Sequence, residues 1–261
     1  MVEHQIRFVD GAGYERMMGL WSRAVGEVFL DWLTPDNGLV WADIGCGNGA
    51  FTELVVDRCE PLRITGVDPS PEQLAYARGR HTAGIAEFIQ GDAMALPIAD
   101  ASVDAATMAL VIFFVPQPAK GLAEMLRVVR PGGSVSAYAW DFLDGGFPWE
   151  PVHEELRVLG LPPAQPPSAE VARLDNLTRL WQESGLHSVE TRAITVEREF
   201  ADFEEFWTIA QLAPTLSHAL QTLPADVLAG VKERVRSKIH TRGGKVVHSA
   251  RANAAKGIRP A

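Results

Sequence analysis

Three glycines and an aspartate lie together in the segment Asp43-Ile-Gly-Cys-Gly-Asn-Gly49. Glycines at alternate positions let a chain turn tightly and leave its N–H groups open to a ligand. A phosphate would suit the helix expected to begin near Asn48, but the Asp43 carboxylate repels phosphate and attracts an ammonium group. These residue types and spacings indicate a cradle for a nucleoside cofactor that carries a cationic group.

The same segment is compatible with two further roles. Asp43 could serve only as a helix cap. The glycines, with Ala50 in the last position, also resemble the G-x-G-x-x-G turn of nicotinamide folds, although those folds usually keep an apolar residue where Asp43 stands. Cys46 is expected to fill space in the turn rather than act as a nucleophile, because no histidine stands near it in the sequence to activate it.

Two further aspartates follow short strand-like runs. Arg63–Asp68 is typical of a strand that ends in an acid 23 residues after Gly45, where doubly wound folds bind ribose hydroxyls. Glu87–Gln90 predicts a third strand, followed by Asp92, which could accept a hydrogen bond from an adenine amino group. Because the carboxyl ends of parallel strands meet at one edge of a sheet, we expect Asp43, Asp68 and Asp92 to surround one crevice.

The elements that must position these acids alternate between strands and helices. The apolar pattern predicts further strands at 39–44, 103–115 and 134–140, and helices at 14–33, 48–59 and 118–129. Such alternation predicts an α/β fold with a doubly wound, mostly parallel sheet. Two later strands, at 187–199 and 245–256, are expected to form an antiparallel edge, with helices inserted between them.

Five motifs in a fixed order resemble the class I S-adenosylmethionine-dependent methyltransferases. More narrowly, they are similar to the small-molecule branch that includes the ubiquinone/menaquinone-pathway C-methyltransferases. The resemblance covers residues 39–140, and residues 200–207 and 250–252 also resemble bacterial members of this branch that lack an assigned substrate. The motifs are Asp-Ile-Gly-Cys-Gly-Asn-Gly at 43–49, Val-Asp-Pro-Ser at 67–70, Gly-Asp-Ala-x-x-Leu-Pro at 91–97, Asp-Ala-Ser-Val-Asp-Ala at 100–105 and Arg-Val-Val-Arg-Pro-Gly-Gly at 127–133.

The resemblance implies a seven-stranded Rossmann-like fold with an antiparallel edge and a helical lid, and S-adenosylmethionine as the cofactor. It implies cofactor-binding roles for eight residues. Asp43, Gly45 and Gly47 would meet the methionine part, Asp68 with the adjacent Pro69 the ribose, Asp92 and Ala93 the adenine, and Leu110 would form the wall beside the sulfonium.

We expect one methyltransferase domain over residues 1–261, with an N-terminal cap helix within residues 1–38 and a cofactor-binding core at 39–140. Residues 141–186 and 200–243, which are rich in prolines and short helices, are expected to form lid or substrate-binding insertions. A transfer site must exclude water, so these segments should roof the open edge of the sheet. Their aromatic and sulfur-containing side chains predict a small, mainly apolar or aromatic acceptor. The candidate acceptor-binding residues are Tyr14, Met18, Trp21, Trp149 and Trp207, with Phe142, Phe147 and Phe206 nearby.

In-line methyl transfer needs mainly positioning and exclusion of water, so the catalytic residue stays unknown. Candidates for a weak base are Asp141, Asp144 and His153, which follow the fifth strand. Methylation of nucleic-acid bases is disfavoured because no Asn-Pro-Pro-Tyr type motif follows the fourth strand. No metal-binding pattern is evident in the sequence. A cofactor-binding protein without turnover and a nicotinamide-dependent oxidoreductase remain alternatives.

Composition indicates the class of partner. The 261 residues are 47% hydrophobic with a net charge of −9, which favours small-molecule chemistry over binding to nucleic acid or an anionic membrane. The longest apolar run is too short to span a bilayer and only two cysteines are present, so we expect a cytoplasmic protein. Residues 227–261 carry nine Lys or Arg against one acid, which indicates either a solvated face or a site for an anionic partner. The acceptor, the methylated atom and the oligomeric state stay open.

Overall fold

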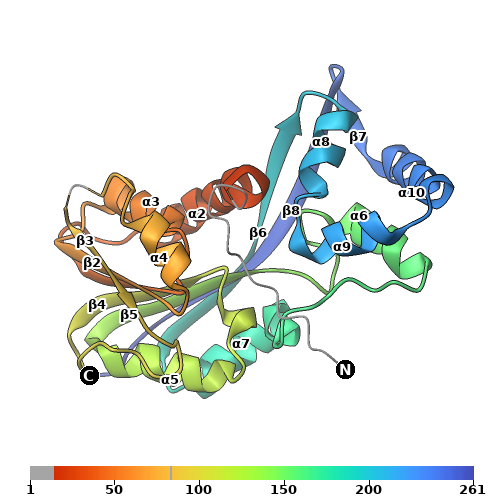
Figure 1. Ribbon diagram of the computed structural model, residues 1–261. Helices are drawn as coiled ribbons and strands as arrows, with labels where there is room; N and C mark the ends of the chain where they lie inside the picture. The colour runs from red at the N-terminus through yellow and green to blue at the C-terminus, as the bar shows by residue number, and fades with distance from the viewer. Residues whose placement is uncertain (1–14, 83) are drawn as a thin grey trace.

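A mixed sheet with the strand order β3-β2-β1-β4-β5-β8-β6 forms the centre of the molecule (Figure 1). The computed structural model describes residues 15–82 and 84–261. The first five strands of this order are parallel, β8 runs antiparallel to β5, and β6 at the edge runs antiparallel to β8. The predicted seven-strand path with its antiparallel edge is confirmed, and a short further strand, β7, pairs with β8. The strands are β1 (Val40–Ile44), β2 (Arg63–Asp68), β3 (Ala86–Gln90), β4 (Val103–Ala109), β5 (Val129–Trp140), β6 (His187–Phe200), β7 (His240–Arg242) and β8 (Lys245–Ile258).

Helices cover both faces of the sheet (Figure 1). On one face, α2 (Leu20–Leu33) packs against β6 and against α3 (Ala50–Cys59); on the other, α5 (Pro118–Val128) packs against β4 and β5. A π-helical turn, η1 (Glu15–Gly19), leads into α2, while α4 (Pro71–Ala77) packs beside β2 and β3. The predicted helix at 14–33 is thus present from residue 15, whereas Tyr14 lies outside the described residues.

The predicted lid segment 141–186 divides in two. Its first part contains α6 (Glu150–Val158) and the short 3-10 helix η3 (Ala169–Ala172). Its second part, α7 (Leu174–Glu183), instead packs against β6 and β8 on the face that also carries α5, and the Trp181 indole N–H donates to the carbonyl oxygen of Val135 at 3.3 Å. The buried side of this helix therefore covers the sheet rather than its edge.

Two strand limits differ from the predicted ones. The strand predicted at 103–115 ends at Ala109, because Leu110 takes a left-handed backbone conformation with φ of 62° and a 3-10 turn, η2 (Ile112–Phe114), follows. The strand predicted from Ser134 begins at Val129, since residues 130–133 form a bulge between two registers of β4 and β5. The apolar run continues past the end of β4, and Arg-Pro-Gly-Gly at 130–133 has the composition of a turn, so neither limit was evident from the sequence.

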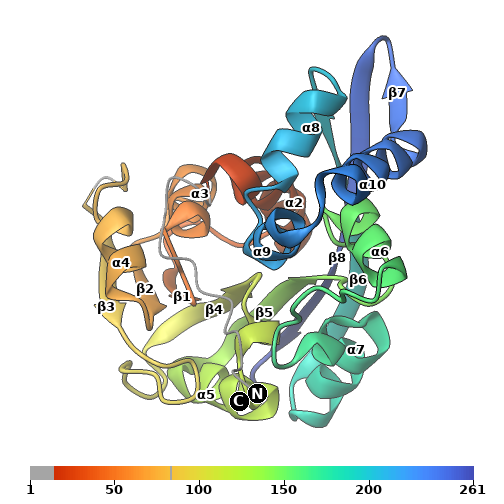
Figure 2. The same cartoon turned by 45° about the vertical axis from the view of Figure 1, so that its right-hand side comes forward.

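The strands β6 and β8 reach far beyond the carboxyl end of β5 (Figure 2). The β5–β8 pairing stops at Trp140 and Ala252, whereas β6–β8 pairing continues to Phe200 and Val246, roughly 20 Å farther at 3.4 Å per residue. Around this projection gather α6 and three helices that connect β6 to β7. These three are α8 (Phe203–Ala210), α9 (Pro214–Thr222) and α10 (Ala225–Lys238).

Candidate functional site

The glycine turn after β1 is held in a conformation that other residues rarely adopt. Gly45, Gly47 and Gly49 have φ of 74°, 53° and 78°. The N–H groups of Gly45 and Cys46 donate to the carbonyl oxygen of Val67 at 2.7 and 3.0 Å, which fixes the turn against the end of β2.

The space around the glycines differs from one to the next. A Cβ on Gly45 would come within 2.4 Å of Val111, so this glycine is needed for packing. A Cβ on Gly47 would meet nothing nearer than a backbone oxygen at 4.0 Å. The backbone at Gly47 is therefore the point at which a ligand can approach the chain.

Asp43 lies in β1 two residues before the turn and is fully buried. One carboxylate oxygen accepts from the Thr52 hydroxyl at 2.6 Å, while the other, Oδ1, is buried with no partner among the described residues. Burial raises the pKa of Asp43 to about 7, with a further contribution from the charge of Asp68, although the hydrogen bonds from Thr52 oppose this. Thr52 lies in the first turn of α3, so capping explains one oxygen of Asp43 but leaves the other open for a ligand.

Asp68 ties the end of β2 to the glycine turn. Its two oxygens accept from the backbone N–H groups of Gly47 at 2.9 Å and Ser70 at 2.8 Å. Burial raises the pKa of Asp68 above its ordinary value, and these two hydrogen bonds offset only part of that rise. Each oxygen keeps a second lone pair, which is what a pair of ribose hydroxyls would need.

The predicted acids come to the carboxyl edges of three adjacent strands. Asp68 pairs with Gln90 in the β2–β3 register, so the exposed Asp92 follows at the next strand end. Asp43 pairs with Gly66, two residues deeper in the sheet than Asp68. Asp92 Oδ1 accepts from the Met94 N–H at 2.8 Å, which shapes the loop after β3.

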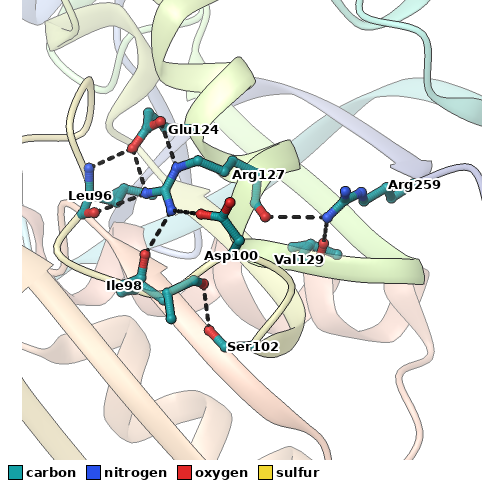
Figure 3. A network of polar contacts seen from close by, with 9 residues as sticks. Leu96, Ile98, Asp100, Ser102, Glu124, Arg127, Val129 and Arg259 are labelled. Carbon is teal, nitrogen blue, oxygen red and sulfur yellow. Dashed lines mark hydrogen bonds and ion pairs between the residues drawn. The ribbon is translucent and has the colours of Figure 1, made fainter.

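The loop that carries Asp92 and Ala93 is anchored by Arg127 of α5 (Figure 3). The Arg127 guanidinium donates to the carbonyl oxygens of Leu96 and Ile98 at 3.0 and 2.9 Å, and pairs with Glu124 and Asp100. One side chain thus fixes the loop at several points between β3 and β4.

The remaining predicted cofactor residues surround the same edge. Leu110 is 8% exposed, its backbone φ of 62° is strained for a leucine, and its N–H donates to the Tyr138 carbonyl oxygen at 2.9 Å. Strain of this kind is concentrated at functional sites. Pro69 is exposed and its carbonyl oxygen accepts from Gln90, while Ala93 is half-buried against the core.

Each of the three candidate bases is engaged in this structure. Asp141 is buried and accepts two hydrogen bonds from Arg251, at 3.0 and 2.8 Å. Asp144 pairs with Arg173 at 2.6 Å. His153 is buried, its Nε2 lies 3.1 Å from the Thr215 hydroxyl, and burial lowers its pKa to about 3. In this structure Asp141, Asp144 and His153 therefore hold neighbouring parts of the chain together.

Two of the predicted acceptor-binding aromatics lie together. The Trp21 and Trp149 rings are in edge-to-face contact at 6.4 Å, and Phe200 and Phe206 extend the cluster. Met18 is also buried, but Trp207 stacks on Phe203 at 6.2 Å. Phe142 and Phe147 form a second stack with His153, and Phe142 also contacts Phe113 in the turn after Leu110.

Two polar residues within this aromatic cluster were not predicted from the sequence. Arg198 and His248 lie opposite each other on β6 and β8. The missed signal is the alternation in β6, where Ile194, Val196, Arg198 and Phe200 are buried in turn. Arg198 occupies an inward position that the pattern reserves for apolar side chains.

The basic C-terminal segment is paired within the chain. Of its nine cationic residues, eight lie within 4.0 Å of an acid, and Arg259 donates to the backbone carbonyls of Arg127 and Val129. Lys232 and Arg236 pair with Glu204, Arg234 with Glu155, Lys238 with Glu154 and Glu155, Arg242 with Glu197 and Glu199, Lys245 with Glu199, Arg251 with Asp141, and Lys256 with Glu190. This pairing favours a solvated face over an anion-binding site.

None of the helices in residues 15–82 and 84–261 combines the length and apolar character needed to cross a membrane. Within the same ranges, no three His, Cys, Asp or Glu side chains come together as a metal site would require.

Comparison with known proteins identifies the central part of the chain. Residues 42–137, which contain the glycine turn and all three acids, match the family model described as a methyltransferase domain. These residues therefore resemble a methyltransferase domain. Malonyl-acyl-carrier-protein O-methyltransferase of Pectobacterium atrosepticum is 33% identical over 144 residues, which are 51% of this chain and 55% of that protein. The ubiquinone/menaquinone biosynthesis C-methyltransferase of Paracoccus denitrificans is 36% identical over 128 residues, 46% of this chain and 51% of that one.

The chain thus spans about half the length of these curated relatives. Similarity of fold extends over the whole chain. Phosphoethanolamine N-methyltransferase 2 of Haemonchus contortus, solved in complex with S-adenosyl-L-methionine, superimposes with a TM-score of 0.63 at 16% identity. That alignment covers 100% of this chain and 59% of the nematode protein.

Proposed function

We propose that this protein binds S-adenosylmethionine and transfers its methyl group in line to a small, mainly apolar or aromatic acceptor. The observation that carries the proposal is the buried Asp43 carboxylate, whose Oδ1 has no partner among the described residues, next to a glycine turn that is open at Gly47. A buried carboxylate oxygen without a partner is costly unless a cationic ligand completes it. The ammonium of a methionine moiety is such a ligand.

The proposed cofactor contacts follow the strand edges. Asp43, with the backbone of Gly45 and Gly47, would hold the methionine part, and Asp68 with Pro69 the ribose. The loop fixed by Arg127 would offer Asp92 and Ala93 to the adenine, and Leu110 would lie beside the sulfonium. S-adenosylmethionine supplies an already activated methyl group, so the chain itself has to position the acceptor and exclude water.

We further propose that residues 141–186, without α7, and residues 200–243 roof the acceptor. Met18, Trp21, Trp149 and Trp207 are the acceptor-binding candidates that the structure describes, and their buried aromatic surface suits an apolar or aromatic body. The relatives' names include both an O- and a C-methyltransferase, so the likeness does not assign the atom that is methylated.

Calorimetric titration tests the cofactor, and turnover tests the reaction. We expect S-adenosylmethionine and S-adenosylhomocysteine to bind the purified protein and NADH not to bind; binding of NADH alone would favour the oxidoreductase alternative. Formation of S-adenosylhomocysteine over a panel of phenols, quinols and acyl carboxylates, followed by mass spectrometry, should reveal transfer. Cofactor binding without product over the whole panel would favour the alternative of a binding protein without turnover.

A further inference from the structure

Four buried polar atoms of the aromatic cluster have no hydrogen-bond partner among residues 15–82 and 84–261. They are Trp21 Nε1, Trp149 Nε1, Arg198 Nε and His248 Nε2. The side chains touch one another or a common neighbour. The Trp21 ring lies 6.0 Å from the His248 ring and 6.4 Å from the Trp149 ring, and the Arg198 guanidinium stacks on Phe200 at 4.5 Å.

These atoms lie beyond the carboxyl edge of the parallel strands. Arg198 and His248 are direct partners in the β6–β8 register, four residues past the last β5 pair at Ala252, or about 14 Å at 3.4 Å per residue. Ligands of doubly wound sheets bind on this side of the sheet. Trp21 reaches the pair from α2 and Trp149 from the turn before α6, so the four groups come from four separate elements, and Trp149 belongs to a segment proposed to roof the acceptor.

Arg198 carries a charge that the rest of the cluster does not neutralise. The side chain is 9% exposed, its Nη1 donates to the Met17 carbonyl oxygen at 3.2 Å, and it forms no ion pair with a described residue. The acid whose charge reaches it is Glu205, and that carboxylate accepts from the Ala201 N–H at 2.5 Å. A buried guanidinium left with an open N–H is costly unless an oxygen of a ligand completes it.

His248 supplies the opposite kind of group. Its ring N–H donates to the backbone carbonyl of Pro148, which leaves Nε2 with a lone pair, and burial lowers the pKa of this histidine to about 4. The four groups therefore comprise three N–H donors and one acceptor. A carboxylate could use only the donors, whereas a hydroxyl both accepts from N–H groups and donates to a ring nitrogen.

We infer that Trp21, Trp149, Arg198 and His248 form a subsite for the acidic hydroxyl of a phenolic or enolic acceptor. The hydroxyl donates to His248 Nε2, and the two lone pairs of its oxygen accept from Arg198 Nε and the Trp21 indole N–H, while Trp149 borders the subsite. The aromatic rings of the cluster contact the apolar body of the acceptor. The inference rests on the proposed function, and it adds to the apolar acceptor a polar end with a defined place.

The test uses calorimetry on the full chain saturated with S-adenosylhomocysteine. The probes are 2-naphthol and 2-methoxynaphthalene, which have the same aromatic body, but the ether has no proton to donate. We expect 2-naphthol to bind about tenfold or more tightly than 2-methoxynaphthalene, because the ether loses a hydrogen bond at a buried polar site. Equal affinities would overturn the inference, and tighter binding of 2-naphthoate than of 2-naphthol would show that the subsite takes a carboxylate instead.

Variants locate the effect. Trp21→Phe removes one N–H and keeps a ring, and Trp41→Phe is its matched control, because Trp41 Nε1 is also buried without a partner among the described residues but lies in β1. We expect Trp21→Phe to lower 2-naphthol affinity several-fold with little change for the ether, and Trp41→Phe to leave both affinities unchanged. Arg198→Met should act like Trp21→Phe; if that variant does not fold, the tryptophan pair decides. Equal effects of the two tryptophan variants would contradict the subsite.

The cofactor titration separates the two claims. Failure of S-adenosylhomocysteine to bind the wild-type protein would contradict the proposed function. Normal binding of S-adenosylhomocysteine, with no preference for 2-naphthol, would contradict only the hydroxyl subsite.

Discussion

Asp43 is buried without a countercharge among the described residues, so its ionisation reduces the free energy of unfolding. Its pKa is about 7 in the folded chain, against 3.8 for an unperturbed aspartate. Below pH 3.8 both states are protonated and nothing is lost; between pH 3.8 and 7 the unfolded chain ionises first, so stability falls as pH rises, and above pH 7 the loss is constant. At 1.36 kcal/mol per pKa unit the loss is on the order of a few kcal/mol.

Replacement of Asp43 by Asn should therefore stabilise the protein while weakening cofactor binding. We expect Asp43→Asn to match the wild type in urea unfolding near pH 4 and to exceed it at pH 8, and its affinity for S-adenosylhomocysteine to fall about tenfold or more. Asp31→Asn, on the exposed pair with Arg58, is the control and should change neither quantity by much. A variant that binds the cofactor product normally would show that Asp43 is only a structural cap.

Gly47 and Gly38 form a natural matched pair. Both have positive φ, 53° and 75°, and neither added Cβ would clash, so alanine should cost each about 1 kcal/mol of backbone strain. Only Gly47 lies where the ligand is expected to approach. Gly47→Ala should lower the affinity for S-adenosylhomocysteine about tenfold or more, whereas Gly38→Ala should leave it unchanged. Equal affinities in the two variants would place the cofactor elsewhere.

Among the secondary-structure elements, Arg127 links α5 to the loop after β3. Arg127→Met removes the donors that hold Leu96 and Ile98, so the loop should become easier to cleave with protease, and affinity for S-adenosylhomocysteine should fall several-fold. Arg130→Met is the control from just beyond the same helix, because Arg130 pairs only with Asp104 among the described acids. Loss of stability without loss of affinity in Arg127→Met would mean that this loop does not contact the cofactor.

The local sequence was sufficient to predict the elements that are specified by residues close together in the chain. The strands that end at Ile44 and Asp68, the glycine turn and the antiparallel edge all follow from apolar runs, glycines and alternation. The end of β4 was hidden because Leu110 turns the chain while keeping an apolar side chain, and α7 was assigned to the lid because its packing partners, β6 and β8, follow later in the chain. The Arg198–His248 pair depends on register between strands about 50 residues apart, which no local pattern specifies.

At the scale of the molecule, the helices beyond the sheet edge are joined to one another by ion pairs. Glu155 of α6 is 3% exposed and accepts from Arg234 and Lys238 of α10 at 2.5 and 2.7 Å. Burial alone would raise the pKa of Glu155, but hydrogen bonds with the two cations outweigh it and lower the pKa. The stabilisation is therefore present above the ordinary pKa of glutamate and is lost as the pH falls through the lowered value.

Glu155→Gln should weaken the contact between α6 and α10. Since the carboxylate is buried and has two cationic partners, we expect a loss of about 2 kcal/mol or more in urea unfolding at pH 7. Glu154→Gln is the matched control, because the Glu154 side chain is 53% exposed. This variant should lose less than about 1 kcal/mol of unfolding free energy. Similar losses in the two variants would show that the α6–α10 contact depends on apolar packing instead.

The measurement that tests the central claim most directly is a crystal structure of the protein with S-adenosylhomocysteine. The account predicts the ribose hydroxyls on Asp68, the amino-acid part over Gly47 with its ammonium near Asp43 Oδ1, the adenine against Asp92 and Ala93, and the sulfur facing Leu110 and the aromatic cluster around Trp21. Density for the ligand at any other edge of the sheet, or at this edge with neither Asp43 nor Asp68 in contact, would contradict it.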